Sequence, residues 1–206
     1  MAKKKTKRFG NPAKNAEYQA REARLHGASL SEKDSSLFYG IFTPLLVFTD
    51  KRLDVLKNAI EDIDGTKVVM DYDEALASIS DELWKNPSLL DAYMEETTLS
   101  EEQKALLQSW KRYVQGKFAV VRHQKNGSVL VDIETEKVYR VKGIIDTLED
   151  MLAGFPLPFV IQTTLLPFKD VIITSGHIGV AYEENAENAE KLYQQAKENG
   201  TIITVL

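Results

Sequence analysis

The chain has 206 residues, of which 43% are hydrophobic and 28% charged, a composition typical of a globular protein long enough to bury a core. It contains no cysteine, which excludes disulfides, thiolate metal sites and cysteine nucleophiles. The net charge of −5 hides an asymmetry: residues 1–30 hold eight basic and two acidic side chains, or +6, and the remainder carries −11.

The most basic segment is an N-terminal arm that carries Lys3, Lys4, Lys5, Lys7 and Arg8. No apolar segment of the kind a secretory signal needs follows this arm. Such an arm on an acidic body favours weak, salt-sensitive contact with a polyanion such as nucleic acid. The alternative is a solvated tail that contributes only solubility.

Residues 1–27 are predicted to be this basic tail or a marginal helix, and residues 28–116 a helical region. The stretch at 37–48 is the most apolar, but it is too short to cross a membrane. With the absence of cysteine, this indicates a cytoplasmic protein. The candidate helices lie at 12–25, 35–48, 53–63, 72–83, 87–94 and 100–116.

Local signals mark where several of these helices begin or bend. Pro44 is expected to kink the second helix or to restart it after Thr43. Asp71 with Glu74, and Ser100 with Gln103, have the spacing of capping boxes.

After Gly116 the apolar period changes from helical to alternating, which predicts strands in a domain over residues 117–206. Asn126-Gly127 is a strong hairpin signal between the first two strands. A short helix over Ile144–Ala153 is expected to turn Ile145, Leu148 and Leu152 inward. The strand candidates are 117–123, 128–133, 138–141, 159–165, 171–174, 178–182 and 201–206, and the last helix is 185–199.

The predicted fold class is therefore α+β. A helical N-terminal half packs on a mostly antiparallel C-terminal sheet or small barrel that carries one or two helices.

The segment LLPFKDVIITSG at 165–176 is predicted to be a corner of this sheet. Pro167 lacks an N–H and would end one strand, and Lys169-Asp170 would form the turn. Gly176 would supply a backbone torsion that other residues resist. A functional interpretation is that Lys169 and His177 rim a partner site here.

Three segments resemble a widespread group of bacterial proteins of unknown function: SWKRYVQGKFAVVRH at 109–123, LPFKDVIITSG at 166–176 and AKENGTIITVL at 196–206. The helical half is similar more weakly, through LFYGIFTPLLVFTDKRL at 37–53. The resemblance covers roughly half the chain and implies a fold unit but no reaction. In that group an acidic residue often precedes the glycine of the corner, where this chain has Ser175.

The three histidines, His26, His123 and His177, have no recognised metal-ligand spacing, so no metal site is expected. The chain also lacks the glycine-rich motifs that bind nucleotide phosphates, so no cofactor is expected. We therefore expect a non-enzymatic interaction module, and a protein partner is one possibility. The alternative is a small hydrolase that uses His177 as general base in a Ser175–Gly179 loop.

Overall fold

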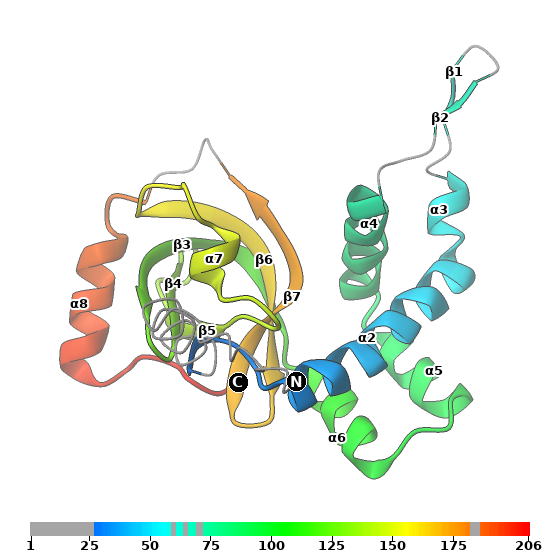
Figure 1. Ribbon diagram of the computed structural model, residues 1–206, viewed down its shortest axis with the longest axis horizontal. Helices are drawn as coiled ribbons and strands as arrows, with labels where there is room; N and C mark the ends of the chain where they lie inside the picture. The colour runs from blue at the N-terminus through cyan, green and yellow to red at the C-terminus, as the bar shows by residue number, and fades with distance from the viewer. Residues whose placement is uncertain (1–26, 59–60, 64–65, 69–71, 182–185) are drawn as a thin grey trace, which may run out of the picture.

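A computed structural model of the chain describes residues 27–58, 61–63, 66–68, 72–181 and 186–206. These residues form a layer of helices beside a closed five-stranded barrel (Figure 1). The α+β prediction is confirmed, and the barrel is the form that the C-terminal strands take. The arm at residues 1–26, with its predicted helix and His26, lies outside the described residues, as does the cap at Asp71. No helix in the described ranges has the length and apolar character needed to cross a bilayer.

The helical layer consists of α2 (Glu32–Leu53), α3 (Val55–Asn58), α4 (Tyr72–Lys85), α5 (Ser88–Glu96) and α6 (Glu101–Trp110). Ser31 caps α2 by accepting a hydrogen bond from the Asp34 N–H at 3.2 Å. The predicted capping box of Ser100 and Gln103 is present at the start of α6.

Pro44 neither ends nor restarts α2, which runs through it. Proline removes the hydrogen bond to the carbonyl four residues earlier, here that of Gly40. Both Pro44 and Gly40 are exposed, so solvent can satisfy the released carbonyl without breaking the helix.

The predicted helix over 53–63 is wrong beyond one turn. Asp54 takes a left-handed conformation at φ 53° and ends α2, and Asp50 Oδ1 accepts from the Leu56 N–H at 2.9 Å. The chain then forms a short antiparallel pair, β1 (Glu61–Ile63) and β2 (Thr66–Val68). The sequence Asp64-Gly65 between these strands is a hairpin signal, and it outweighs the helical spacing of the apolar residues.

The barrel consists of β3 (Val114–Gln124), β4 (Gly127–Asp132), β5 (Val138–Lys142), β6 (Phe159–Phe168) and β7 (Val171–Val180). Its strands lie in the order β3-β4-β5-β7-β6, and every neighbouring pair is antiparallel except β5 with β7. β3 begins at Val114, three residues before the predicted boundary, because α6 already ends at Trp110. Gly127 of β4 has a φ of 126°. It lies so close to β5 that a Cβ at this position would stand 2.6 Å from the Val141 carbonyl oxygen.

Three further strand and helix predictions need correction. β7 is one continuous strand across residues 171–180, so the predicted Ser175–Gly179 loop is not a loop. A register shift between Thr163 and Leu165, together with the φ of 93° at Gly176, lets the strand continue. Ile145 is 60% exposed because the short helix α7 (Leu148–Met151) begins after it. Residues 201–206 form an isolated bridge from Ile203 to Tyr139 in place of the predicted strand.

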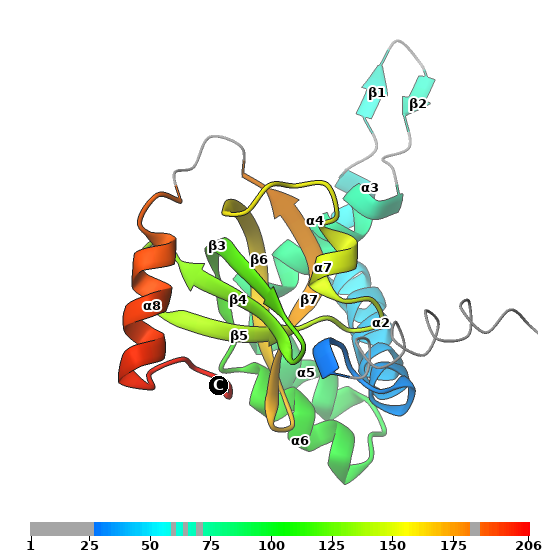
Figure 2. The same cartoon turned by 60° about the vertical axis from the view of Figure 1, so that its left-hand side comes forward.

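The last helix, α8 (Ala189–Asn199), packs on the outer face of the barrel, on the side away from the helical layer (Figure 2). Ala189, Tyr193 and Ala196 are buried against the barrel, and Gly200 ends the helix in a left-handed conformation.

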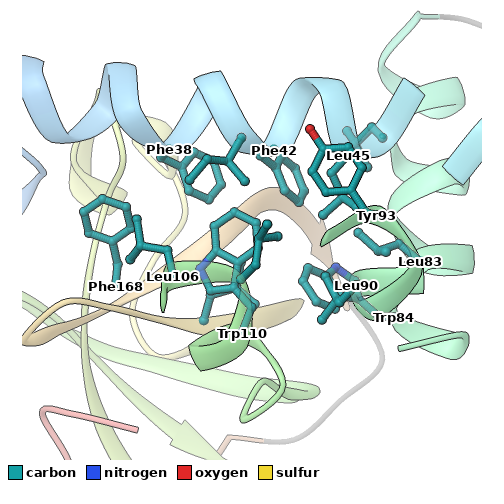
Figure 3. Packing of buried hydrophobic residues seen from close by; sticks show 14 of the residues in the cluster. Phe38, Phe42, Leu45, Leu83, Trp84, Leu90, Tyr93, Leu106, Trp110 and Phe168 are labelled. Carbon is teal, nitrogen blue, oxygen red and sulfur yellow. The ribbon is translucent and has the colours of Figure 1, made fainter. Parts of the chain in front are cut away.

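The helical layer and the barrel share one hydrophobic cluster (Figure 3). From the helices, Phe38 and Trp110 contribute rings whose centroids lie 5.6 Å apart. From the β6–β7 hairpin, Phe168 reaches the same cluster with its ring 6.4 Å from that of Phe38. The corner is therefore the place where the barrel is joined to the helices.

Candidate functional site

Two adjoining cavities lie between the barrel and the helical layer, with volumes of about 690 and 730 Å³. Four residues of β7 line both of them: Ser175, His177, Ile178 and Val180. Strand β7 is therefore the shared wall of a single cleft, which we call the β7 cleft.

The first part of the cleft is the more polar of the two and lies where α4 faces strands β3, β6 and β7. Glu74 and Asp81 of α4 stand opposite Lys117 of β3 and Gln162 of β6 in its lining. This part therefore offers carboxylate, ammonium and amide groups in the same cavity as His177.

The second part is mostly apolar and extends over α2, α4 and the segment around α7. Its walls include Leu46 of α2, Leu76 and Ile79 of α4, and Leu152 and Phe155. We call this part the apolar groove.

Three large apolar side chains stand at the rim of the apolar groove and remain in solvent. Tyr39 is 39% exposed, Val47 is 49% exposed and Met151 is 45% exposed. Most large exposed apolar groups of a folded protein are scattered, so their gathering at one groove indicates a contact surface.

His177 and Ser175 lie in the wall of the cleft. His177 is half-buried, and its backbone carbonyl accepts a hydrogen bond from Thr163 Oγ1 at 2.6 Å. Ser175 is only 2% exposed. The register between β7 and β6 skips residues 175–177, so Ser175 and His177 lie at an irregularity of the strand pair rather than in a loop.

Lys169 is placed elsewhere, at the β6–β7 turn, and does not line either cavity. Its Nζ donates to Asp34 Oδ1 at 2.6 Å and pairs with Glu102 Oε1 at 3.3 Å. The hydrogen bond from Lys169 lowers the pKa of Asp34, and the same bond raises the pKa of Lys169. The structure therefore separates Lys169 from His177 and gives it contacts with the first turns of α2 and α6.

His123 is also outside the cleft. Its Nδ1 lies 2.7 Å from Ser128 Oγ, and burial lowers its pKa while Glu149 acts in the opposite direction. Within the ranges that the structure describes, no group of three or more His, Asp or Glu side chains could hold a metal ion.

The apolar groove was not predicted from the sequence, although α2 carries a signal for it. Phe38, Ile41 and Leu45 make one buried face, while Tyr39 and Val47 add apolar residues on another. A helix that is apolar on more than one face needs more than one partner surface.

Comparisons of the chain with protein-family models, with curated proteins and with solved structures found no match. The resemblance of the three quoted segments to a bacterial group stays a prediction.

We predict that Lys169→Ala lowers the free energy of unfolding by about 1 kcal/mol, because two exposed ion pairs are lost. Lys169→Gly loses the same ion pairs. Because Lys169 has a φ of 54°, glycine also relieves a left-handed backbone conformation that costs a non-glycine residue about 1 kcal/mol. The glycine variant should therefore be close to the wild type in urea denaturation. Lys104→Ala, which breaks one pair within α6, is the control, and an equal loss in both alanine variants would contradict a role for the corner pairs.

Proposed function

We propose that this protein is a binding module that works without catalysing a reaction, and that the β7 cleft holds its partner. The observation that carries the proposal is the shared lining of the two cavities by one strand. A cleft of this kind presents a continuous surface from a polar end near Asp81 to an apolar end near Phe155.

The size and lining of the cleft support this proposal. Binding sites in proteins are typically concavities of roughly 300–1,000 Å³ with mostly apolar walls and a few polar groups. Each cavity falls within that range, and the apolar groove adds exposed rim residues that a partner would cover.

The groove should bind the apolar dye 1-anilinonaphthalene-8-sulfonate in the native state. We expect Val47→Glu and Met151→Glu each to weaken dye binding about fivefold, because a carboxylate at the rim opposes both burial of the dye and its sulfonate. Val205→Glu is the matched control, since Val205 is also 49% exposed and lines neither cavity. Fluorescence titration measures the three affinities. Equal binding by all three variants, or no dye binding by the wild type, would contradict the proposal.

The basic arm is proposed to add a second, weaker contact with polyanions. The support for this contact is the charge of the sequence, with +6 on residues 1–30 against −11 on the rest. Lysine and arginine contacts with phosphates release counterions, which makes such binding steep in salt concentration.

We predict that the full chain binds a mixed-sequence single-stranded 30-nucleotide DNA with an affinity that falls as salt rises. Contact by Lys3, Lys4, Lys5, Lys7 and Arg8 would contribute about 3 to 4 units to the slope of log K against log salt. A full-length variant with these five residues changed to Gln should lose that contribution, as should a chain that begins at residue 27. Fluorescence anisotropy across a salt series measures the slopes. Unchanged DNA binding by the five-fold Gln variant and by the chain that begins at residue 27 would contradict this part of the proposal.

A second candidate function is hydrolysis with His177 as general base. The observation in its favour is that His177 lies in a concave wall beside the buried Ser175, where a substrate could be held. A histidine accepts a proton only in its neutral form, so such an enzyme would gain rate as pH rises.

Hydrolysis of p-nitrophenyl acetate between pH 5 and 9 distinguishes the two functions. For a binding module we expect the wild type and His177→Asn to hydrolyse the ester at the same rate. His123→Asn is the control, because His123 lies outside both cavities. A pH-dependent rate that is lost in His177→Asn and kept in His123→Asn would favour the hydrolase instead.

A further inference from the structure

Strand β7 is paired unequally on its two edges. On one edge it pairs with β6 from Val171 to Val180, with a register shift in between. On the other edge it pairs with β5 only through Ile172 and Ile173. The barrel is thus closed by two residue pairs, and the remainder of β7 extends past the end of β5.

The backbone of Ile178 and Val180 is directed to the second edge. Ala181, just beyond the strand, donates its N–H to the Val160 carbonyl on the β6 side at 2.9 Å. In an antiparallel pair the residues that bond to the neighbouring strand alternate with residues that point away from it. Given the register of Val180 with Ile161 and of Ile178 with Thr163, these two residues turn their N–H and C=O groups away from β6.

Within the described part of the chain, Ile178 and Val180 have a strand neighbour on the β6 side alone. A row of backbone donors and acceptors on a sheet edge is a template for one more strand. This chemistry selects an extended peptide, because only a main chain supplies donors and acceptors at the matching spacing.

The apolar groove adjoins this edge of β7. Ile178 and Val180 line the groove together with Met151, Phe155 and Leu46. Successive side chains of an added strand point to opposite faces, so every second side chain could enter the groove. The groove therefore favours apolar side chains at alternate positions of a bound segment.

The charge of the protein favours basic residues at the positions between them. The chain beyond residue 30 carries −11. The two cavities together are lined by three carboxylates, Glu74, Asp81 and Asp50, and by two ammonium groups, Lys117 and Lys51. A basic segment is attracted to such a body and is held there more firmly at low salt.

We propose that the partner is an extended, basic peptide segment that adds as a strand to β7 at Ile178 and Val180 and places alternate apolar side chains in the apolar groove. This inference rests on the proposed binding function, and it names the partner's chemical class and its mode of binding.

The first experiment selects ligands for the full chain from a displayed library of ten-residue peptides. Odd positions are apolar and even positions are Lys, Arg or Thr. The strongest binder is then synthesised in two forms, one with N-methyl groups on its odd-numbered residues and one with N-methyl groups on its even-numbered residues. Strand addition turns the N–H groups of only one of these two sets toward β7. Methylation of that set should weaken binding at least tenfold, by loss of about two hydrogen bonds. The other form is the matched control. The protein itself is unchanged, so folding does not enter the comparison.

Amide hydrogen exchange locates the bound strand. The amides of Ile178 and Val180 should exchange rapidly in the protein alone and slow at least tenfold when the peptide binds. The amide of Ala181, which is already bonded to β6, should change little. Equal sensitivity to both methylation patterns, or protection that maps away from Ile178 and Val180, would overturn the proposal.

The outcome separates this inference from the binding function on which it rests. Dye binding that is weakened by Val47→Glu, with no peptide selected from the library, would overturn strand addition and leave the cleft as a site for a different class of ligand. Absence of both dye and peptide binding would overturn both proposals.

Discussion

The packing of Phe168 into the helical cluster joins the barrel to the helices. Phe168 is almost completely buried, and it comes from the turn end of the β6–β7 hairpin. Its neighbours include Phe38 of α2 and, within the same cluster, Trp110 of α6. Burial of aromatic side chains is the largest single source of hydrophobic stabilisation in such a contact. The β6–β7 hairpin is therefore anchored to the helices at one end.

Anchoring at one end explains why a cleft exists at the other. The hairpin leaves the shared cluster at its Phe168 end, and the cavities lie farther along β7, from Ser175 to Val180. There residues of the helical layer and of the barrel line the two cavities. Lys169 strengthens the anchored end through Asp34 and Glu102, which gives this residue a structural role in the position of the cleft.

The cleft and the second edge of β7 belong together physically. A strand that extends past its neighbour leaves backbone groups without a ladder partner, and β7 does this where its residues line the groove. Ligand recognition by such a surface would combine main-chain hydrogen bonds, which are independent of sequence, with pockets for alternate side chains, which are not. His177 stands at the junction of the polar and apolar parts, so it is suited to contact a ligand in either part.

Elements whose signals are local could be predicted from the amino-acid sequence. The capping box at Ser100, the glycine that ends α8 and the apolar face at Tyr193 could each be predicted, because their causes lie within one or two helical turns. The change from helical to alternating period after Gly116 likewise predicted the α+β fold class. That β7 runs unbroken through Ser175 and Gly176 could be seen only in the folded structure, because this continuity depends on an irregular register between β7 and β6. The parallel pairing of β5 with β7 and the cleft that β7 lines arise from contacts between segments far apart in the chain. No local pattern encodes such contacts, since their free energy comes from surfaces that meet only when the fold is complete.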